Sequence, residues 1–329
     1  MSKTIIQASS RSGHRASYCE LFEAMSGGSS SIGRIDWGRF TELISAEKVI
    51  LATIDDEYFR GALVVFVRSF LLRPTYVLFL RPWACFLKAP LFKSFALRLI
   101  FILLRRLPRS KVLSIVPHTL NPQLKRVTND WIYDPQMWDL WVNGTPCLPD
   151  SGLSDRVIRE KIDRKVLVFI GKGNDSKQFS LLADLATECY RKLLIVVAGK
   201  VDVKFRDHAD RMREVGMIVE SRYVTDEEVL SLYKVADYSW CCYSPKYDQA
   251  SGVFGRSIQT GVMPIVRRGS VISQFGFSYL DVDDLLKNLE KIESKDVCYD
   301  ESVLNYQLST ITSRMILDVC NKLDLGNYR

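Results

Sequence analysis

The sequence predicts an α/β protein of two domains, each built on a parallel sheet covered by helices. In both halves of the chain, short apolar runs typical of buried strands alternate with longer stretches of helical periodicity. The alternation restarts after Pro149-Asp150-Ser151-Gly152, which we interpret as a linker. A chain of 329 residues is long enough for two cores of ordinary size. We therefore expect domains over 1–150 and 151–300, and a C-terminal helix over 301–329 that is able to cross back to the first domain.

Four segments of the first half have the composition of buried strands: 3–8, 48–53, 75–80 and 112–116. Helical stretches over 18–25, 58–71 and 92–107 lie between them. In the second half we expect strands over 165–170, 193–198, 217–221, 238–243 and 263–266, and helices over 178–192, 226–235 and 301–323. Ligands of such domains bind at the carboxyl ends of the strands, so the loops that follow the strands are where functional residues are expected.

The net charge of +7 is unevenly distributed. Residues 58–129 contain no Asp or Glu but thirteen of the 45 Lys and Arg. The remainder of the chain has the other 32 basic residues and all 38 acidic residues, so its net charge is −6. The same stretch is rich in Phe, Trp and Leu, but its apolar runs are far shorter than the roughly 20 residues that span a bilayer.

Basic residues beside aromatic and leucine-rich faces suit a helix that lies in the interface of an anionic membrane. The alternative is a core helix whose exposed face is basic. Nucleic acid is disfavoured because aliphatic side chains dilute the cations. We therefore expect residues 60–111 to contact an anionic membrane surface, and no nucleic-acid partner.

The eight cysteines show no CxxC pair and no zinc-like spacing, which favours free thiols in a reducing compartment. The N-terminal apolar run is too short for a signal peptide. We expect a cytoplasmic protein, peripheral on the inner face of the cell membrane.

The loop and helix from Tyr247 to Gly261, before the apolar run 263–266, have the composition of a phosphate cradle. Backbone N–H groups at a helix start lack intrahelical partners and carry partial positive charge. Ser251 is the expected N-cap, and Gly252 would let a ligand approach the backbone. An ordinary connection between a strand and a helix is the alternative.

Several segments precede this loop in a characteristic order. The expected strand 165–170 ends in Gly171-Lys172, and Lys177 follows five residues later. Strand 193–198 ends at Gly199, and Tyr223-Val224 precede helix 226–235. Together these segments resemble the donor domain of GT-B glycosyltransferases, most closely the large retaining family four, over roughly residues 165–270. The resemblance implies two Rossmann-like domains facing across a cleft.

The resemblance also implies roles for these residues. Lys172 and Lys177, beside Gly171, would neutralise the diphosphate of a nucleotide-sugar, and Tyr223 and Val224 would contact its base. The family's Glu-x7-Glu element falls on Asp248 and Arg256. Asp248 would lie near the transferred sugar as a catalytic residue, and the backbone between the two positions would meet sugar and phosphate. The donor-binding residues there are Ser251, Gly252, Val253, Phe254 and Arg256.

Neither end of the element is Glu. Asp248 keeps the charge with a shorter reach, whereas Arg256 inverts it and would suit phosphate or a base edge better than ribose. Three interpretations stay open: a divergent active enzyme, which we favour, an enzyme with a different activated donor, and a scaffold without catalysis.

In the first half, Ser10-Arg11-Ser12-Gly13-His14 resembles the family's Gly-rich first loop, so Gly13 is a candidate donor contact and His14 a candidate catalytic residue. His14 as a helix-capping residue is an equal alternative. The family often has a His after a middle strand of this domain. Here Arg81 follows strand 75–80 and is a candidate catalytic residue, while His118 ends the next strand.

No metal site is expected, although Asp55-Asp56 and Asp281-Val282-Asp283-Asp284 are acidic, since GT-B enzymes do not require a metal. No cofactor is expected beyond the nucleotide-sugar donor substrate. The expected function is metal-independent, retaining hexosyl transfer to a lipid-linked or oligosaccharide acceptor at the membrane, in polysaccharide or glycoconjugate biosynthesis. A non-catalytic GT-B-like subunit and a sugar-nucleotide epimerase are the alternatives.

Overall fold

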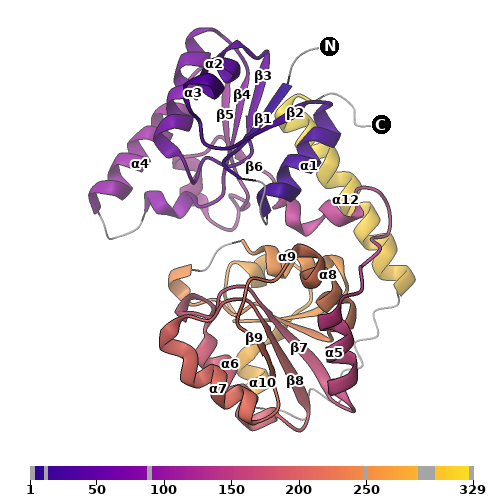
Figure 1. Ribbon diagram of the computed structural model, residues 1–329. Coiled ribbons are helices and arrows are strands. Elements are labelled where there is room, and N and C mark those ends of the chain that lie inside the picture. Colours follow the sequence, from indigo (N-terminus) through magenta and orange to yellow (C-terminus); the bar gives the residue numbers. More distant parts are fainter. Residues whose placement is uncertain (1–3, 11–13, 87–90, 248–249, 288–300, 326–329) are drawn as a thin grey trace. The chain divides into compact units, whose positions relative to one another are not determined.

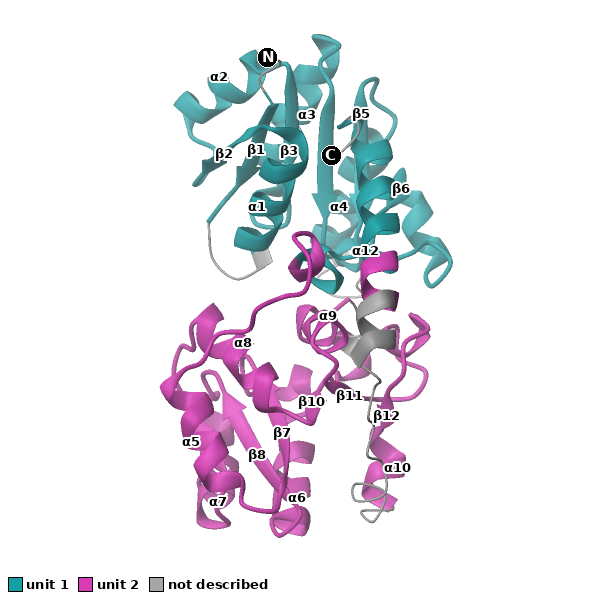
Figure 2. Ribbon diagram, turned by 90° about the vertical axis from the view of Figure 1, so that its right-hand side faces the viewer, with its two compact units in different colours: residues 1–139, 311–329 teal, residues 140–310 magenta. Residues whose placement is uncertain are grey.

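The computed structural model describes residues 4–10, 14–86, 91–247, 250–287 and 301–325, which form two compact units (Figures 1 and 2). Unit 1 comprises residues 1–139 and 311–329, and unit 2 comprises residues 140–310. The division falls at 139/140, and the end of the C-terminal helix belongs to unit 1.

Unit 1 contains a six-stranded parallel sheet in the order β2-β1-β3-β4-β5-β6. Its strands are β1 (Thr4–Ala8), β2 (Ser29–Ile32), β3 (Lys48–Leu51), β4 (Thr75–Phe79), β5 (Ser110–Ser114) and β6 (Asp130–Trp131). Its helices are α1 (His14–Ser26), α2 (Trp37–Ser45), α3 (Tyr58–Phe70), α4 (Leu91–Leu104) and the end of α12 (Glu301–Leu323). In Figure 1, α2, α3 and α4 cover one face of the sheet, and α1 and α12 cover the other.

The end of α12 is tied to one face of this sheet. Lys48 donates to the backbone oxygen of Asp324, and the Tyr76 hydroxyl donates to the Asp324 carboxylate at 2.6 Å. The Lys322 ammonium lies 4.5 Å from the ring centre of Trp131. These contacts reach strands β3, β4 and β6, so the last turn of α12 is an integral part of unit 1.

Unit 2 contains a second six-stranded parallel sheet in the order β12-β11-β10-β7-β8-β9. Its strands are β7 (Lys165–Ile170), β8 (Leu193–Ala198), β9 (Ile218–Glu220), β10 (Tyr238–Trp240), β11 (Met263–Val266) and β12 (Leu280–Asp281). Its helices are α5 (Gly152–Lys161), α6 (Phe179–Cys189), α7 (Arg206–Glu214), α8 (Asp226–Val235), α9 (Gly252–Gln259) and α10 (Val282–Lys287). Counted along the chain, this is the strand order of a Rossmann fold.

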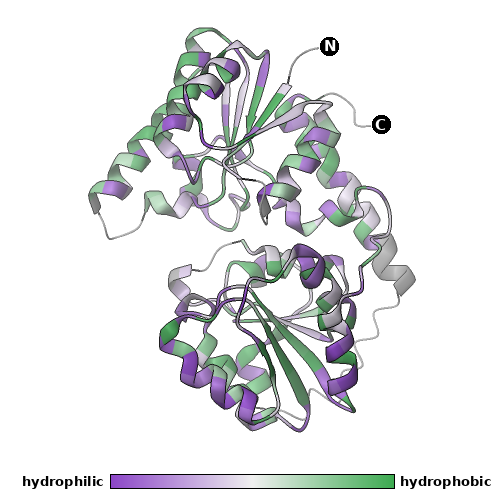
Figure 3. Cartoon of the chain, in the orientation of Figure 1, coloured by the Kyte–Doolittle hydropathy of each residue, from purple (hydrophilic) through white to green (hydrophobic). Residues whose placement is uncertain are grey.

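Two cores sandwich the second sheet. Alternate residues of β7 and β8 pack with α5 and α8 on one face and with α6, α7 and α10 on the other. After Lys165 at the start of β7, both strands are therefore apolar, and these residues are green in Figure 3. A strand buried on both faces produces this continuous apolar signal, which explains why the expected ranges 165–170 and 193–198 match the observed strands.

Elements with weaker patterns were missed by the sequence analysis. Strand β2 is the polar edge segment Ser-Ser-Ser-Ile, and β6 and β12 have two residues each. The linker interpretation of 149–152 was wrong. Ser151 caps α5 with a reciprocal capping box, and Leu153 packs into the core of unit 2.

Candidate functional site

The strand order reverses once in each sheet, between β1 and β3 in unit 1 and between β7 and β10 in unit 2. In open parallel sheets, ligands bind beyond the carboxyl ends of the strands at such a reversal. The residues that follow these four strands are therefore the candidates for function, and each unit is described separately.

In unit 2, Gly171 and Lys177 come together at the end of β7. Gly171 has φ +100°, and a Cβ on it would lie 2.6 Å from the Lys177 ammonium nitrogen. The backbone conformation thus favours glycine, and the Lys177 side chain folds over it. The Lys177 ammonium donates to the backbone oxygen of Ile170 and lies 5.6 Å from the Phe169 ring centre and 5.9 Å from that of Tyr243.

The Lys177 ammonium has no carboxylate within salt-bridge distance among the residues that the structure describes. Burial lowers its pKa to about 8, and the neighbouring Cys241 acts weakly in the opposite direction. A cation held against aromatic rings without an acidic partner is poised to bind an anion.

Lys172 has a different environment. Its ammonium lies 2.6 Å from the Asp202 carboxylate, and its side chain is 56% exposed. An anion near Lys172 would have to compete with this acid. The two lysines of the predicted diphosphate site are therefore unequal, and Lys177 is the stronger candidate.

The start of α9 is built as the sequence predicts, with Ser251 as its N-cap. The Ser251 hydroxyl accepts from the backbone N–H of Phe254 at 3.2 Å and lies 2.6 Å from the Tyr243 hydroxyl. The Tyr233 hydroxyl donates to the carbonyl of Val253 at 3.0 Å. These bonds fix the first turn of α9, where Gly252 and Val253 are partly exposed.

Two predicted donor residues serve the core of unit 2. Phe254 is 1% exposed and its ring lies beside those of Phe275 and Phe277. Val224 packs among the apolar residues of α5 and α8. Tyr223, next to Val224, is 74% exposed. Of this pair, only the tyrosine has a side chain free to contact a ligand.

Other predicted residues are placed less completely. Arg256 lies on α9 and is partly buried. Gly13 and Asp248 lie outside the described residues. His14 is the first residue of α1, and its side chain is not among those described.

In unit 1, the acidic pair after β3 organises the ends of three strands. The Asp55 carboxylate accepts from the backbone N–H groups of Leu80 and Arg81, both at 2.8 Å, and so ties β3 to β4. The Asp56 carboxylate accepts from the Ser9 hydroxyl at 2.6 Å and forms an ion pair with Arg15 at 2.6 Å.

The two acids differ in protonation. Burial raises the pKa of Asp55 to about 6, although its backbone donors and the charge of Arg81 oppose the shift. Burial also acts on Asp56, but the hydrogen bond from Ser9 and the charge of Arg15 outweigh it and lower the pKa. Asp56 is thus ionised at neutral pH, whereas Asp55 gains or loses its proton at a pH just below neutral.

The raised pKa of Asp55 makes stability depend on pH. Between the usual pKa near 4 and about 6, the folded protein binds this proton more tightly than the unfolded chain, so this group's contribution to stability falls as pH rises. We measure the free energy of unfolding in urea at pH 4, 5, 6 and 7. It is expected to fall less with rising pH in Asp55→Asn than in the wild type. Exposed Asp155→Asn is the control. Parallel curves for wild type and Asp55→Asn would contradict the assignment.

From the sequence, Asp55-Asp56 were considered only as an acidic pair at which no metal is expected, and Ser9 and Arg15 were not singled out. The available signal was two acids directly after a buried strand at a sheet reversal. His118 is a core residue: it is 7% exposed and its Nε2 lies 2.8 Å from the Thr128 hydroxyl. Among the described residues, no three His, Cys, Asp or Glu side chains form a cluster able to hold a metal.

Comparisons with solved structures identify the architecture. Anabaena HepE, solved with UDP and glucose, superposes with a TM-score of 0.67 at 10% identity, over 98% of this chain and 100% of that one. A putative UDP-N-acetylglucosamine 2-epimerase from Listeria monocytogenes gives 0.57 at 10% identity, over 100% and 99% of the two chains. OtsA without ligand gives 0.55 at 10% identity, over 99% of both.

The chain has the GT-B fold. This confirms the expected fold class of two Rossmann-like α/β domains with a C-terminal helix. No protein-family profile and no curated protein sequence matches the chain. Membership of the retaining family four therefore stays a prediction.

Proposed function

We propose that the protein is a glycosyltransferase that uses a nucleotide-sugar donor. The observation that carries the proposal is the Lys177 ammonium, which lies without an acidic partner among the described residues, at the sheet reversal of unit 2. The GT-B fold supports it, since HepE has been solved with UDP-glucose. The expected reaction is transfer to a lipid-linked or oligosaccharide acceptor, with retention of configuration and without a metal.

In this proposal the donor diphosphate is bound by Lys177, with Lys172 as a weaker second cation. The backbone N–H groups of Gly252 and Val253 would receive the remaining phosphate oxygens, because the first turn of a helix leaves such donors unpaired. Tyr223 would stack on the base. Asp248 would lie near the sugar, and Arg256 would contact phosphate or base.

In unit 1, the proposed catalytic residues are Arg81 and His14. Arg81 adjoins the Asp55 carboxylate through its backbone N–H, so its position is fixed by the same acid that joins β3 and β4. Its guanidinium would stabilise negative charge that develops during the transfer.

Donor binding by unit 2 can be tested directly. We expect thermal stabilisation of the full chain by UDP or by another nucleoside diphosphate in a panel, and slow hydrolysis of the matching nucleotide-sugar. Stabilisation without hydrolysis or transfer would favour the non-catalytic subunit. No stabilisation by any nucleotide would contradict the proposal.

We also propose that α3 and α4 of unit 1 dock on an anionic membrane. Large apolar side chains recur on each helix at spacings of three and four residues and are exposed: Phe59, Leu63, Phe66 and Phe70 on α3, and Phe92, Phe95, Leu99 and Leu103 on α4. The two helices contact each other and lie on the same face of the sheet. Soluble monomers rarely expose large apolar patches without a partner.

Exposed cations flank this surface, including Lys93 and Arg106. Arg105, in contrast, donates to the carbonyl of Lys125 and is less available to lipid. No helix among the described residues has the length and apolar content to cross a bilayer. The proposed contact is therefore insertion of side chains into the interface, with the basic residues beside anionic headgroups.

The double variant Phe92→Ser, Phe95→Ser is expected to bind phosphatidylglycerol-containing liposomes at least tenfold more weakly in flotation assays. Burial of each Phe in an apolar phase is worth about 1.5–3 kcal/mol, so the loss of two is measurable. Leu317→Ser is the control, because Leu317 is 57% exposed on α12, which covers the opposite face of the sheet. Equal loss in both variants, or no loss, would count against docking through α3 and α4.

A further inference from the structure

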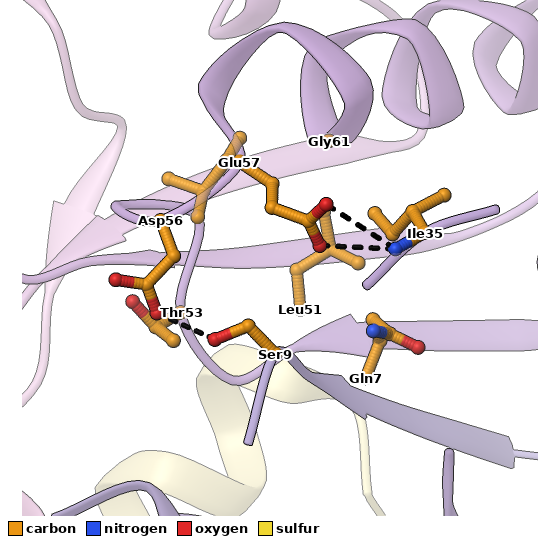
Figure 4. Close-up of a pocket in the computed structure, with 9 residues that line it drawn as sticks. Gln7, Ser9, Ile35, Leu51, Thr53, Asp56, Glu57 and Gly61 are labelled. Atoms are coloured by element: carbon orange, nitrogen blue, oxygen red, sulfur yellow. Dashed lines mark hydrogen bonds between the residues drawn. The ribbon is translucent and has the colours of Figure 1, made fainter. Parts of the chain in front are cut away.

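A small pocket in unit 1 lies at the reversal between β1 and β3, and the roles proposed above leave it unused. It is lined by the ends of both strands, the segment after β2 and the first turn of α3 (Figure 4). Its interior has room for about one water-sized group, and it opens to solvent. Sites that hold a whole small ligand usually measure roughly 300–1,000 Å³. The pocket therefore suits one protruding group of a larger molecule.

Gln7 on β1 contributes an unpaired acceptor to the pocket wall. Its side chain is buried, with 3% of the residue exposed, and its Nε2 donates to the carbonyls of Gly33 at 2.7 Å and Ala8 at 3.2 Å. These two carbonyls fix the orientation of the amide. The Oε1 atom has no hydrogen-bond partner. A buried acceptor left unpaired costs about 1–3 kcal/mol, which a donor supplied by a ligand would recover.

The other polar groups of the lining also offer acceptors. The Ser9 hydroxyl donates to Asp56, and the Thr53 hydroxyl donates to Asp55, so both hydroxyl oxygens keep lone pairs for a donor. The Glu57 carboxylate accepts from the backbone N–H of Ile35 at 3.0 Å. None of these side chains has a proton left to donate, so an anion such as phosphate would find no side-chain hydrogen-bond donor in the lining.

The acids of the pocket are already charge-balanced. Asp56 pairs with Arg15 at 2.6 Å, and Glu57 pairs with Arg60 at 3.1 Å. An ammonium group would therefore gain little from them, and a neutral donor is favoured. The rest of the lining is apolar and tight: a Cβ on Gly61 would lie 2.8 Å from Cγ1 of Ile54. A hydroxyl on a short carbon stem satisfies both the acceptors and these walls.

We propose that this pocket binds a hydroxyl or hydroxymethyl group of a neutral sugar in the acceptor, and that it discriminates against phosphorylated sugars. The inference rests on the proposed glycosyltransferase function and names the chemistry by which unit 1 recognises its acceptor. The sugar hydroxyl would donate to Gln7 Oε1 or to the oxygens of Ser9, Thr53 and Glu57, while its carbon stem contacts Leu51 and Ile54.

Saturation-transfer NMR on the full chain tests this, with glucose, galactose and mannose as neutral probes and their 6-phosphates as charged counterparts. We expect at least one neutral hexose to bind, and its 6-phosphate to give a signal at least fivefold weaker. Gln7→Leu and Thr53→Val are each expected to reduce the signal of the neutral sugar at least threefold. Surface Gln123→Leu is the matched control.

Thermal melts verify that each variant is folded. If Gln7→Leu does not fold, Thr53→Val alone tests the pocket. The proposal is overturned if none of the three hexoses binds, if a 6-phosphate binds as well as its parent sugar, or if the folded variants bind like wild type. UDP binding is measured on the same samples. If the wild type does not bind UDP, the donor site in unit 2 is refuted instead. Failure of the acceptor pocket and failure of the donor site are therefore distinguishable.

Discussion

Lys177→Met is expected to bind UDP, or the nucleoside diphosphate that the panel selects, at least tenfold more weakly, and to lower kcat/KM for sugar transfer by about 100-fold. A charge-assisted hydrogen bond contributes about 1.5–3 kcal/mol, which corresponds to this range. Methionine keeps the stem beside the Phe169 ring, so the change removes the charge and little packing. Isothermal titration and a transfer assay measure the two quantities.

The other lysines of this region provide graded controls. Lys172→Met is expected to have a smaller effect, since its ammonium is exposed and paired with Asp202. Lys204→Met is expected to have none, because Lys204 is exposed and pairs with Asp175. If Lys172→Met is the more damaging change, the diphosphate lies nearer Lys172 and our ranking is wrong.

The pKa of Lys177 adds a pH signature. Because burial lowers it to about 8, the lysine is mostly protonated at pH 7 and loses its charge as pH rises through 8. Diphosphate affinity should therefore fall between pH 7 and 9 in the wild type, and stay nearly level over that range in Lys177→Arg.

Arg68→Met is expected to destabilise unit 1 by about 4 kcal/mol, the largest stability effect that we predict. Arg68 on α3 is fully buried and donates to the backbone oxygens of Leu43 at 2.5 Å, Ala46 at 2.8 Å, Glu47 at 3.1 Å and Pro74 at 2.8 Å. It also donates to the Thr75 hydroxyl at 2.8 Å. The guanidinium thus caps the C-terminal end of α2, where carbonyls lack intrahelical partners and the dipole favours a cation.

Urea unfolding gives the measurement, with two comparisons. Arg68→Lys keeps the charge but not the planar set of donors, so it should recover about half of the loss. Exposed Arg159→Met should change stability by less than about 0.5 kcal/mol. A loss in Arg68→Met as small as that in Arg159→Met would show that solvent replaces the guanidinium without cost.

Local sequence patterns were informative where one segment contains its own signal. The capping residue Ser251 was predicted beside its helix, and the observed α8 matches the expected range 226–235. The same reasoning missed β2, which is a polar edge strand without an apolar pattern, and the nine-residue helix α2, although α2 is amphipathic. The side chains of the predicted donor residues Val224 and Phe254 lie in the core of unit 2, since a resemblance assigns a position but not the direction of a side chain.

The sequence by itself determined that the chain alternates strands and helices twice, and that glycine and lysine follow the first strand of the second half. Only the tertiary structure decided which charges are paired. Asp202 and Lys172 meet because β7 and β8 are neighbours, and Lys177 is left beside aromatic rings instead of an acid. Likewise, Ser9, Arg15 and Asp56 converge because β1 and β3 are adjacent. Pairing depends on strand order, and strand order is set by packing between segments far apart in the chain, which no local pattern contains.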